Sequence, residues 1–316
     1  MFYNKKPPLA KRVAQKFIAI AKNPFVAIST VVSKAPFKYF FKDVLYLKIR
    51  FRGYTGLRLN LVNPKRFNEK IQCLKLNNRN EAFTALADKY AVRAFISQEI
   101  GEQYLVPLIK KFDTPDEIRL DELPDKFVLK CTHDSGSTIV CDDKTKFDFS
   151  VAKNILRKNL KRNYFFEHRE YPYKNIPPAI VCEAFIPSKE NTVPEDYKIL
   201  CFHGKPRYIQ VDLSRFEKHE RIMYDINWVK QPFNIKYAIY ALEAPKPTGL
   251  NEMLTLAEKL SAKVASPFLR VDFYQSGEKI YFGELTFFEE SGYGLFHPDK
   301  YDFDLGNLID LSNLKK

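Results

Sequence analysis

Apolar and polar positions alternate most regularly along FLRVDFYQSGEKIYFGELT, residues 268–286. This pattern predicts two strands joined by a turn at Gly277. Successive side chains of a strand point to opposite faces, so Arg270 and Asp272 are expected on one face and the apolar residues beside them on the other. The returning strand carries Glu284, and the pairing register decides whether it joins them.

The register is fixed here by an assumption about the turn. If Tyr274 pairs with Ile280 around a five-residue loop, Arg270 faces Glu284 and the charged groups converge. A loop one residue shorter would move Glu284 to the opposite face. The residues expected on one face of the returning strand are Phe282, Glu284 and Thr286.

Helical periodicity dominates the first third of the chain, and shorter strands with turns follow. Helices are expected at 11–22, through much of 43–105 (one entering at Asp88 and ending near Gly101), at 151–170, and at 248–263 with Thr248 as N-cap. Strands are expected at 126–130, 138–141 and 176–186, and a hairpin at 195–212 that turns at His203-Gly204.

Charge is concentrated at the N-terminus. The chain of 316 residues has a net charge of +13, and residues 1–52 hold twelve Lys and Arg against one acid, Asp43. That segment therefore carries +11 and leaves +2 for the rest, which argues against a broad nucleic-acid-binding surface on the fold. The segment either lies on an anionic membrane surface or packs on its own domain with solvated lysines, and contact with nucleic acid is a third alternative. No apolar run in it reaches the ~20 residues that a membrane span needs.

Metal chemistry on cysteine or histidine is not indicated. The five cysteines have no CxxC spacing, and the five histidines form no HxxxH pair. Buried thiols in a reducing compartment are expected, with Cys131 and Cys141 as strand residues. His133 is expected to be a solvated loop residue.

Two stretches carry candidate chemistry. KCTHDSGSTIVCDD (130–143) predicts a strand ending in Lys130 and a loop of hydroxyls and glycine, groups suited to phosphate oxygens. An ordinary hairpin is the alternative, since neither GxxxxGK[ST] nor GxGxxG occurs. In the 268–286 hairpin, two carboxylates among aromatic residues suit a hard divalent cation, and a surface ion pair with Arg270 is the alternative.

Seven strings in order resemble the TupA-like ATP-grasp proteins of cell-surface polysaccharide gene clusters. They are FNEKIQCLKL, LADKYAVR, FVLKCTHDSGS, IVCEAFI, EDYKILCFHGKP, LRVDFY and YFGELTF, and they run from about Phe67 to Gly292. The resemblance implies an α+β ATP-grasp fold, in which two subdomains grip a nucleotide. The expected division is a basic amphipathic arm (1–52), a helical region (53–105), a lid subdomain (106–190) and a C-terminal subdomain with the metal site (191–316).

The resemblance also implies roles for individual residues. Arg93 stands where a Lys commonly contacts the phosphates, and Lys130 is expected to reach the α- and β-phosphates and to be catalytic. The loop expected to cover the triphosphate consists of Ser135, Gly136 and Ser137. The segment whose backbone is expected to contact adenine consists of Glu183, Ala184, Phe185 and Ile186.

The remaining implied roles concern ribose, metal and catalysis. Asp196 is expected to accept hydrogen bonds from ribose, with Lys198 nearby. Asp272 and Glu284 are expected to hold Mg²⁺, and Arg270 to stabilise negative charge near the γ-phosphate and the acceptor. Thr286 stands where many members have a metal-binding Asn, and its single hydroxyl is a poorer ligand.

The implied function is an ATP- and Mg²⁺-dependent carboxylate–amine ligase that works through an acyl phosphate in capsule, lipopolysaccharide or teichuronic-type glycan synthesis. Its substrates would be a glycan or small-molecule carboxylate and an amine or amino acid, and no nucleic acid. It would act in the cytoplasm, in peripheral contact with the anionic inner membrane through residues 1–52.

Three alternatives stay open. A glycosyltransferase of the same pathway would use the DxD triplet at Asp302-Phe303-Asp304, although such a triplet is more often a pair of surface acids. A non-catalytic nucleotide-binding scaffold would not need the metal position that Thr286 alters. A kinase-like enzyme would stop after phosphoryl transfer.

Overall fold

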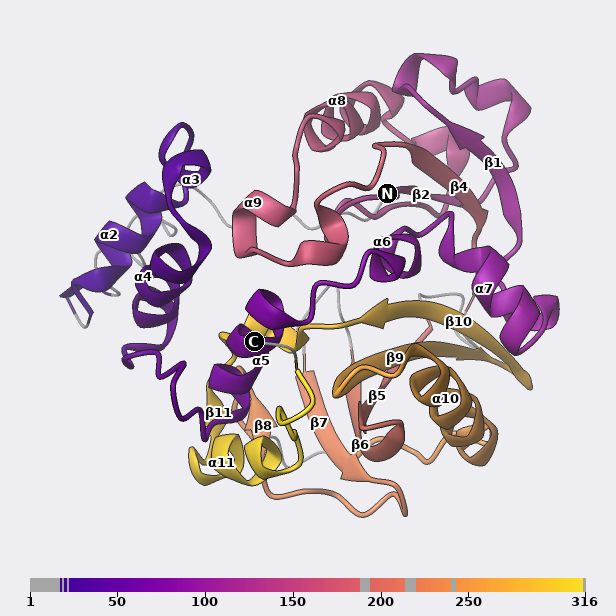
Figure 1. The fold of residues 1–316 in the computed structure, drawn as a ribbon. Helices are drawn as coiled ribbons and strands as arrows, with labels where there is room; N and C mark the ends of the chain where they lie inside the picture. The colour runs from indigo at the N-terminus through magenta and orange to yellow at the C-terminus, as the bar shows by residue number, and fades with distance from the viewer. Residues whose placement is uncertain are drawn as a thin grey trace.

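The computed structural model describes residues 18, 20–21, 23–187, 194–213, 220–239 and 243–314. The helix expected at 11–22 lies almost entirely outside these residues. Two antiparallel sheets lie one above the other, with a separate group of N-terminal helices at one side (Figure 1). No helix among the described residues is long and apolar enough to cross a membrane.

The N-terminal group contains α2 (Phe25–Val32), α3 (Phe37–Phe40) and α4 (Asp43–Thr55). Three helices follow along the body: α5 (Phe67–Asn77), α6 (Ala82–Ala87) and α7 (Val92–Glu99). The helix expected from Asp88 begins later, because the Asp88 carboxylate accepts a hydrogen bond from the Tyr90 N–H at 2.8 Å and closes a turn before α7.

The first sheet has the strand order β1-β4-β2-β3, built from β1 (Leu108–Phe112), β2 (Phe127–Cys131), β3 (Ile139–Cys141) and β4 (Ile180–Ala184). The amphipathic α8 (Phe149–Leu160) packs on it, and Leu156 is completely buried in their shared core. The helix expected at 151–170 is therefore interrupted, and the short α9 (Phe165–His168) follows it.

The second sheet has the order β10-β9-β5-β6-β7. Its strands are β5 (Asp196–Phe202), β6 (Lys205–Leu213), β7 (Glu220–Asp225), β9 (Phe268–Ser276) and β10 (Lys279–Thr286). As expected, β5 and β6 turn at His203-Gly204, where both residues have positive φ. The core against α10 (Leu250–Val264) is the largest of the molecule. Thr248 does not cap α10, because its hydroxyl accepts from Gln275 instead.

Shorter elements complete the chain. A two-stranded sheet joins β8 (Asn234–Ile235) to β11 (Phe296–His297), and α11 (Lys300–Asn307) packs on α5. The 3₁₀ helices are η1 (Glu102–Tyr104), η2 (Pro115–Glu117), η3 (Leu120–Glu122), η4 (Lys144–Lys146), η5 (Tyr171–Tyr173) and η6 (Glu289–Gly292). The first sheet lies within residues 106–190 and the second within 191–316; their behaviour as separate subdomains stays a prediction.

The hairpin of β9 and β10 corrects the predicted register. The turn is shorter than expected, since Lys279 pairs with Ser276 and Tyr274 pairs with Tyr281 rather than Ile280. A shift of one residue alone would have turned Glu284 away from Arg270. An irregularity between Phe282 and Leu285 shifts the register once more, so that Thr286 pairs with Arg270.

The same irregularity separates residues that were expected on one face. Phe282 pairs with Phe273, and their rings lie 6.4 Å apart, whereas Thr286 pairs with Arg270 and donates to Glu284 at 3.1 Å. The predicted convergence of Arg270 and Glu284 is therefore found, and a β-bulge produces it.

Candidate functional site

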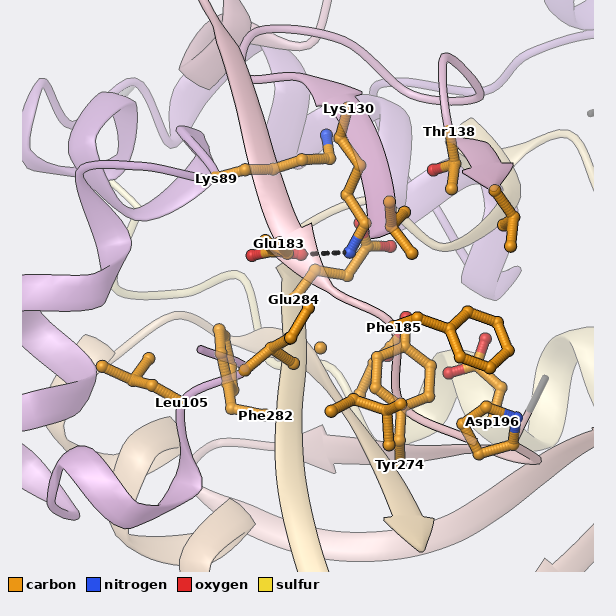
Figure 2. Close-up of a pocket in the computed structure, with 18 of the residues that line it drawn as sticks. Lys89, Leu105, Lys130, Thr138, Glu183, Phe185, Asp196, Tyr274, Phe282 and Glu284 are labelled. Atoms are coloured by element: carbon orange, nitrogen blue, oxygen red, sulfur yellow. Dashed lines mark hydrogen bonds and ion pairs between the residues drawn. The ribbon is translucent and has the colours of Figure 1, made fainter. Parts of the chain in front are cut away.

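A cavity of about 420 Å³ opens between the two sheets. Its walls come from β2, β4 and the loop after β2 on one side, and from β5, β9 and β10 on the other. Figure 2 shows charged side chains at one end, including Lys89 and Lys130, and rings such as Phe185 and Tyr274 at the other. A ligand with one polar and one apolar part fits this division.

The charged end is organised around Glu183. Lys130 Nζ lies 2.7 Å from its carboxylate, and Arg93 Nη1 lies 3.5 Å from it (Figure 2 draws the first pair). Burial favours neutral Lys130, but Glu183, with smaller contributions from Tyr274 and Glu284, raises the lysine pKa above its ordinary value. Two cations share one carboxylate here, so the group has net positive charge beside the cavity.

Lys89 is a site residue that the sequence reasoning missed. It lines the cavity, and its Nζ donates to the Asp134 carbonyl in the loop after β2. Its own N–H donates to Thr132 O at 3.1 Å. The residue stands in the same string as Arg93, LADKYAVR, so a search for every cation in that string would have found it.

The loop between β2 and β3 contributes some of its predicted residues. Ser135, Gly136 and Thr138 line the cavity, and Gly136 has φ +87°, a conformation that side chains other than glycine rarely adopt. Ser137 lies elsewhere, in the buried interior of the loop. Its hydroxyl donates to Asp134 at 2.5 Å and accepts from the Cys131 N–H at 2.9 Å.

The hydrogen bonds of Ser137 therefore stabilise the loop. Thr138 lines the cavity, where Ser137 was expected. His133 is also buried rather than solvated, with Nε2 3.3 Å from Asn159 O. Cys131 and Cys141 are buried, as expected.

The apolar end begins where β4 ends. Glu183, Ala184, Phe185 and Ile186 line the cavity, and the contact of their backbone with the base stays a prediction. Leu105, Tyr274 and Phe282 face it from other elements (Figure 2). An aromatic base can lie between such side chains.

Asp196 and Lys198 lie next to each other on β5. Asp196 lines the cavity and accepts from Lys198, whose Nζ lies 3.2 Å from Asp212 and 3.8 Å from Asp272. The lysine thus offsets part of the charge of three buried carboxylates, which supports a positioning role beside the predicted ribose contact.

Arg270 stands at the centre of the carboxylates predicted on β9 and β10, here called the acidic cluster. Its guanidinium donates to both oxygens of Asp272, at 2.7 and 2.6 Å, and to Glu284 at 3.1 Å. It also donates to Glu289, a buried partner that the sequence reasoning did not identify. Three carboxylates around one arginine leave local negative charge, and burial raises the pKa of Asp272 to about 7 against the opposing effect of Arg270.

A family model described as TupA-like ATPgrasp matches residues 69–310, which is most of the chain. The protein belongs to this family. No curated protein matches its sequence. The fold is therefore the α+β ATP-grasp fold predicted from the sequence strings.

Solved structures with similar folds include several ligases. D-alanine–D-alanine ligase from Bacillus anthracis, complexed with ATP, is 17% identical, with a TM-score of 0.38 over 64% of this chain and 55% of that one. An L-amino acid ligase from Bacillus licheniformis is 13% identical, with a TM-score of 0.43 over 69% and 47%. A RimK domain ATP-grasp protein from Sphaerobacter thermophilus is 14% identical, with a TM-score of 0.39 over 74% and 70%. The match to the first of these spans little more than half of that ligase.

ATP-grasp proteins bind ATP, typically with Mg²⁺, and the acidic cluster suits that ion. Among the described residues no group of three or more His, Cys, Asp or Glu side chains is arranged so that it could hold a metal ion by itself. Mg²⁺ commonly takes only one or two carboxylates and completes its shell with phosphates and water. Asp272 and Glu284 offer such oxygens beside the cavity, and Glu289 Oε1 is buried without a hydrogen bond, so the residues fit the ion.

A second cavity, of about 630 Å³, adjoins the first and shares Ser135, Tyr237 and Glu284 with it. Arg270 and Thr286 line this second cavity, so the acidic cluster stands between the two. Its further lining is rich in rings and charged groups: Tyr54, Tyr164, His168, Glu170, Tyr173, Arg221, Lys236 and Tyr293. Burial lowers the pKa of His168 well below its ordinary value, and Lys75 adds to this effect.

The DxD triplet has a structural role on α11. Asp302 is buried, accepts from the Asn68 N–H at 3.0 Å and lies 3.2 Å from Arg66. It lines neither cavity. The expectation of surface acids is therefore wrong for Asp302, which joins α11 to α5.

Proposed function

We propose that the protein is an ATP- and Mg²⁺-dependent ligase that joins a carboxylate to an amine through an acyl phosphate. The observation that carries the proposal is the position of Arg270 and Glu284 at the boundary of two adjoining cavities. One cavity has the cationic end and apolar end that suit a nucleoside triphosphate, and the other has room for an acceptor. A phosphoryl group passed between them would move past Arg270.

The residues have separate tasks in this reaction. Lys89, Arg93 and Lys130 would neutralise the triphosphate, and the loop of Ser135 and Gly136 would cover it. Asp272 and Glu284 would hold Mg²⁺, which supplies further charge neutralisation on the phosphates. Their buried surroundings strengthen each of these interactions.

The acceptor carboxylate would attack the γ-phosphorus, forming its O–P bond as the bond to ADP breaks. Arg270 would stabilise the negative charge on the transferred group. The amine would then attack the acyl carbon and release phosphate, leaving an amide. No covalent bond to the protein is required, so the chain needs no nucleophile.

For the acceptor we propose a uronic-acid carboxylate of a cell-surface glycan, with an amino acid or other amine as the second substrate. Support comes from the resemblance of the sequence strings and from the tyrosine-rich second cavity, since rings and polar groups together suit a sugar. The proposed place of action is the cytoplasmic side of the membrane, reached through the basic N-terminal segment.

The first test is thermal unfolding with Mg²⁺ and a non-hydrolysable ATP analogue, in parallel with Mg²⁺ and UDP-sugars. A ligand at about 100 times its Kd stabilises the folded state by ~2.7 kcal/mol, which is readily detected. Stabilisation by the ATP analogue alone is expected. Stabilisation by a UDP-sugar alone would favour the glycosyltransferase, and stabilisation by neither ligand would contradict the proposed ATP site.

The second test identifies the chemistry. Uronic acids are screened for carboxylate-dependent ADP release, with hydroxylamine present to trap the acyl phosphate as a hydroxamate. Hydroxamate formation is expected, and it should be lost in Lys130→Met. ADP release with a stable phosphorylated acceptor and no hydroxamate would instead show a kinase-like enzyme.

A further inference from the structure

Exposed apolar side chains gather at the N-terminal helices. Of the seventeen large hydrophobic residues exposed in the described part of the chain, nine lie between residues 18 and 54. They are Ile18, Ile28, Val31, Phe37, Tyr39, Phe40, Val44, Leu45 and Tyr54. Scattered apolar residues are ordinary on a protein surface, but a concentration of this kind marks an interaction site.

Helix α2 shows a partial reversal of polar and apolar positions: one of its two buried residues is the polar Ser29, the other is Val32, and further apolar residues are exposed. Ile28 and Val31 are three residues apart, which places them on one side of the helix, and they are 49% and 54% exposed. The buried residue between them is Ser29, whose carbonyl and hydroxyl accept from Arg50 of α4 at 2.9 and 3.1 Å. A helix on a water-facing surface normally shows the opposite arrangement.

Helix α3 repeats this reversal. Lys38 is buried and lies 2.9 Å from Glu167 of α9, whereas Phe40 is 80% exposed. Phe37 is exposed as well, and the Tyr39 ring packs edge-on against Phe166 at 4.7 Å. Contacts with α9 therefore hold α3 in place with its phenyl rings directed outward.

The charge around these side chains is strongly positive. Residues 23–52 hold six Lys and Arg against one acid, and Lys34, Lys42 and Lys48 are exposed. The single acid of this segment, Asp43, is engaged by Arg79 at 2.5 Å and by Arg169 at 2.7 Å. A second copy of the same surface would be repelled by like charge, whereas anionic headgroups with an apolar layer beneath would complement it.

We propose that α2, α3 and the first turn of α4, here called the α2–α4 surface, dock on an anionic lipid bilayer. Ile28, Val31, Phe37 and Phe40 would enter the headgroup boundary, and the exposed lysines would contact lipid phosphates. This proposal differs from membrane binding by a basic N-terminal arm, because the anchor is a folded surface outside residues 1–22. It holds whatever reaction the enzyme performs. Because α4 also carries Tyr54, which lines the second cavity, one helix would connect the membrane to that cavity.

The test is flotation of the full chain with vesicles, without nucleotide. The vesicles are phosphatidylcholine alone or with ~30% phosphatidylglycerol, in low and high salt. Binding to the anionic vesicles, weakened by salt, is expected. The double variant Phe37→Ser, Phe40→Ser should partition at least ~10-fold less. Val62→Ser, at a 97% exposed apolar residue outside the surface, is the matched control and should bind as wild type does.

Three outcomes would overturn the proposal. One is no binding to anionic vesicles. A second is unchanged binding of the double variant together with loss of binding when residues 1–22 are deleted, which would leave the arm as the anchor. A third is a concentration-dependent dimer that the double variant abolishes. An unchanged thermal unfolding midpoint without ligand would show that each variant is folded, so a failure here is separate from failure of the ligase proposal.

Discussion

The substitution Lys130→Met tests whether Lys130 binds phosphate or only stabilises the fold. The lysine lines the first cavity and donates to Glu183 at 2.7 Å. A lost charge-assisted contact to a phosphate costs ~2 kcal/mol, or about 30-fold in affinity for ATP. Adenosine has no phosphate, so its affinity should change little. Isothermal titration with a non-hydrolysable ATP analogue and with adenosine measures the two effects.

The same substitution also changes stability. Glu183 keeps Arg93 at 3.5 Å but loses its nearer partner, so the free energy of unfolding should fall by ~1–3 kcal/mol. Glu183→Gln is the matched control, because it removes the same ion pair and keeps the Lys130 amine beside the cavity, where a bound triphosphate itself favours the protonated form. It should retain affinity for the ATP analogue within about threefold. If Lys130→Met weakens adenosine and the ATP analogue equally, or if Glu183→Gln weakens the analogue as much, Lys130 does not bind phosphate.

Further substitutions test the metal, the loop and the triplet. Asp272→Asn and Glu284→Gln should each remove the Mg²⁺-dependent part of ATP-analogue binding, measured by titration with and without EDTA; unchanged Mg²⁺ dependence in both would contradict the metal assignment. Ser137→Ala should lower the free energy of unfolding by ~1–2 kcal/mol, because two buried hydrogen bonds are lost, while Ser135→Ala should lower ATP affinity with little effect on urea unfolding. The reverse pattern would exchange their roles. Asp302→Ala should destabilise the fold by ~2 kcal/mol and leave ATP-analogue affinity unchanged, and loss of a UDP-sugar effect in this variant would revive the glycosyltransferase.

Local pattern was sufficient for the strands and for most of the charged site. Alternation with period two located β9 and β10, and the string around Lys130 placed a strand and a loop that do line the cavity. The segment from Glu183 to Ile186 also lines it. These features follow from neighbours in sequence, which is why the sequence alone can predict them.

Other parts of the site depend on geometry that spacing does not encode. A bulge near Glu284 decides its face, and the residues of the turn do not indicate that bulge. Glu289 reaches Arg270 from η6, beyond the hairpin. Lys89 and Ser137 have residue types that suit phosphate equally well, and only the folded loop places one at the cavity and buries the other.

The sequence by itself determined the family, the two groups of strands and the excess of positive charge at the N-terminus, because each follows from the local composition and the order of residues. Only the tertiary structure decided which face of each N-terminal helix meets water. Ser29 and Lys38 are buried because Arg50 and Glu167, distant in the chain, provide their partners. Those long-range partners compensate the burial of polar groups, and so turn the apolar residues outward.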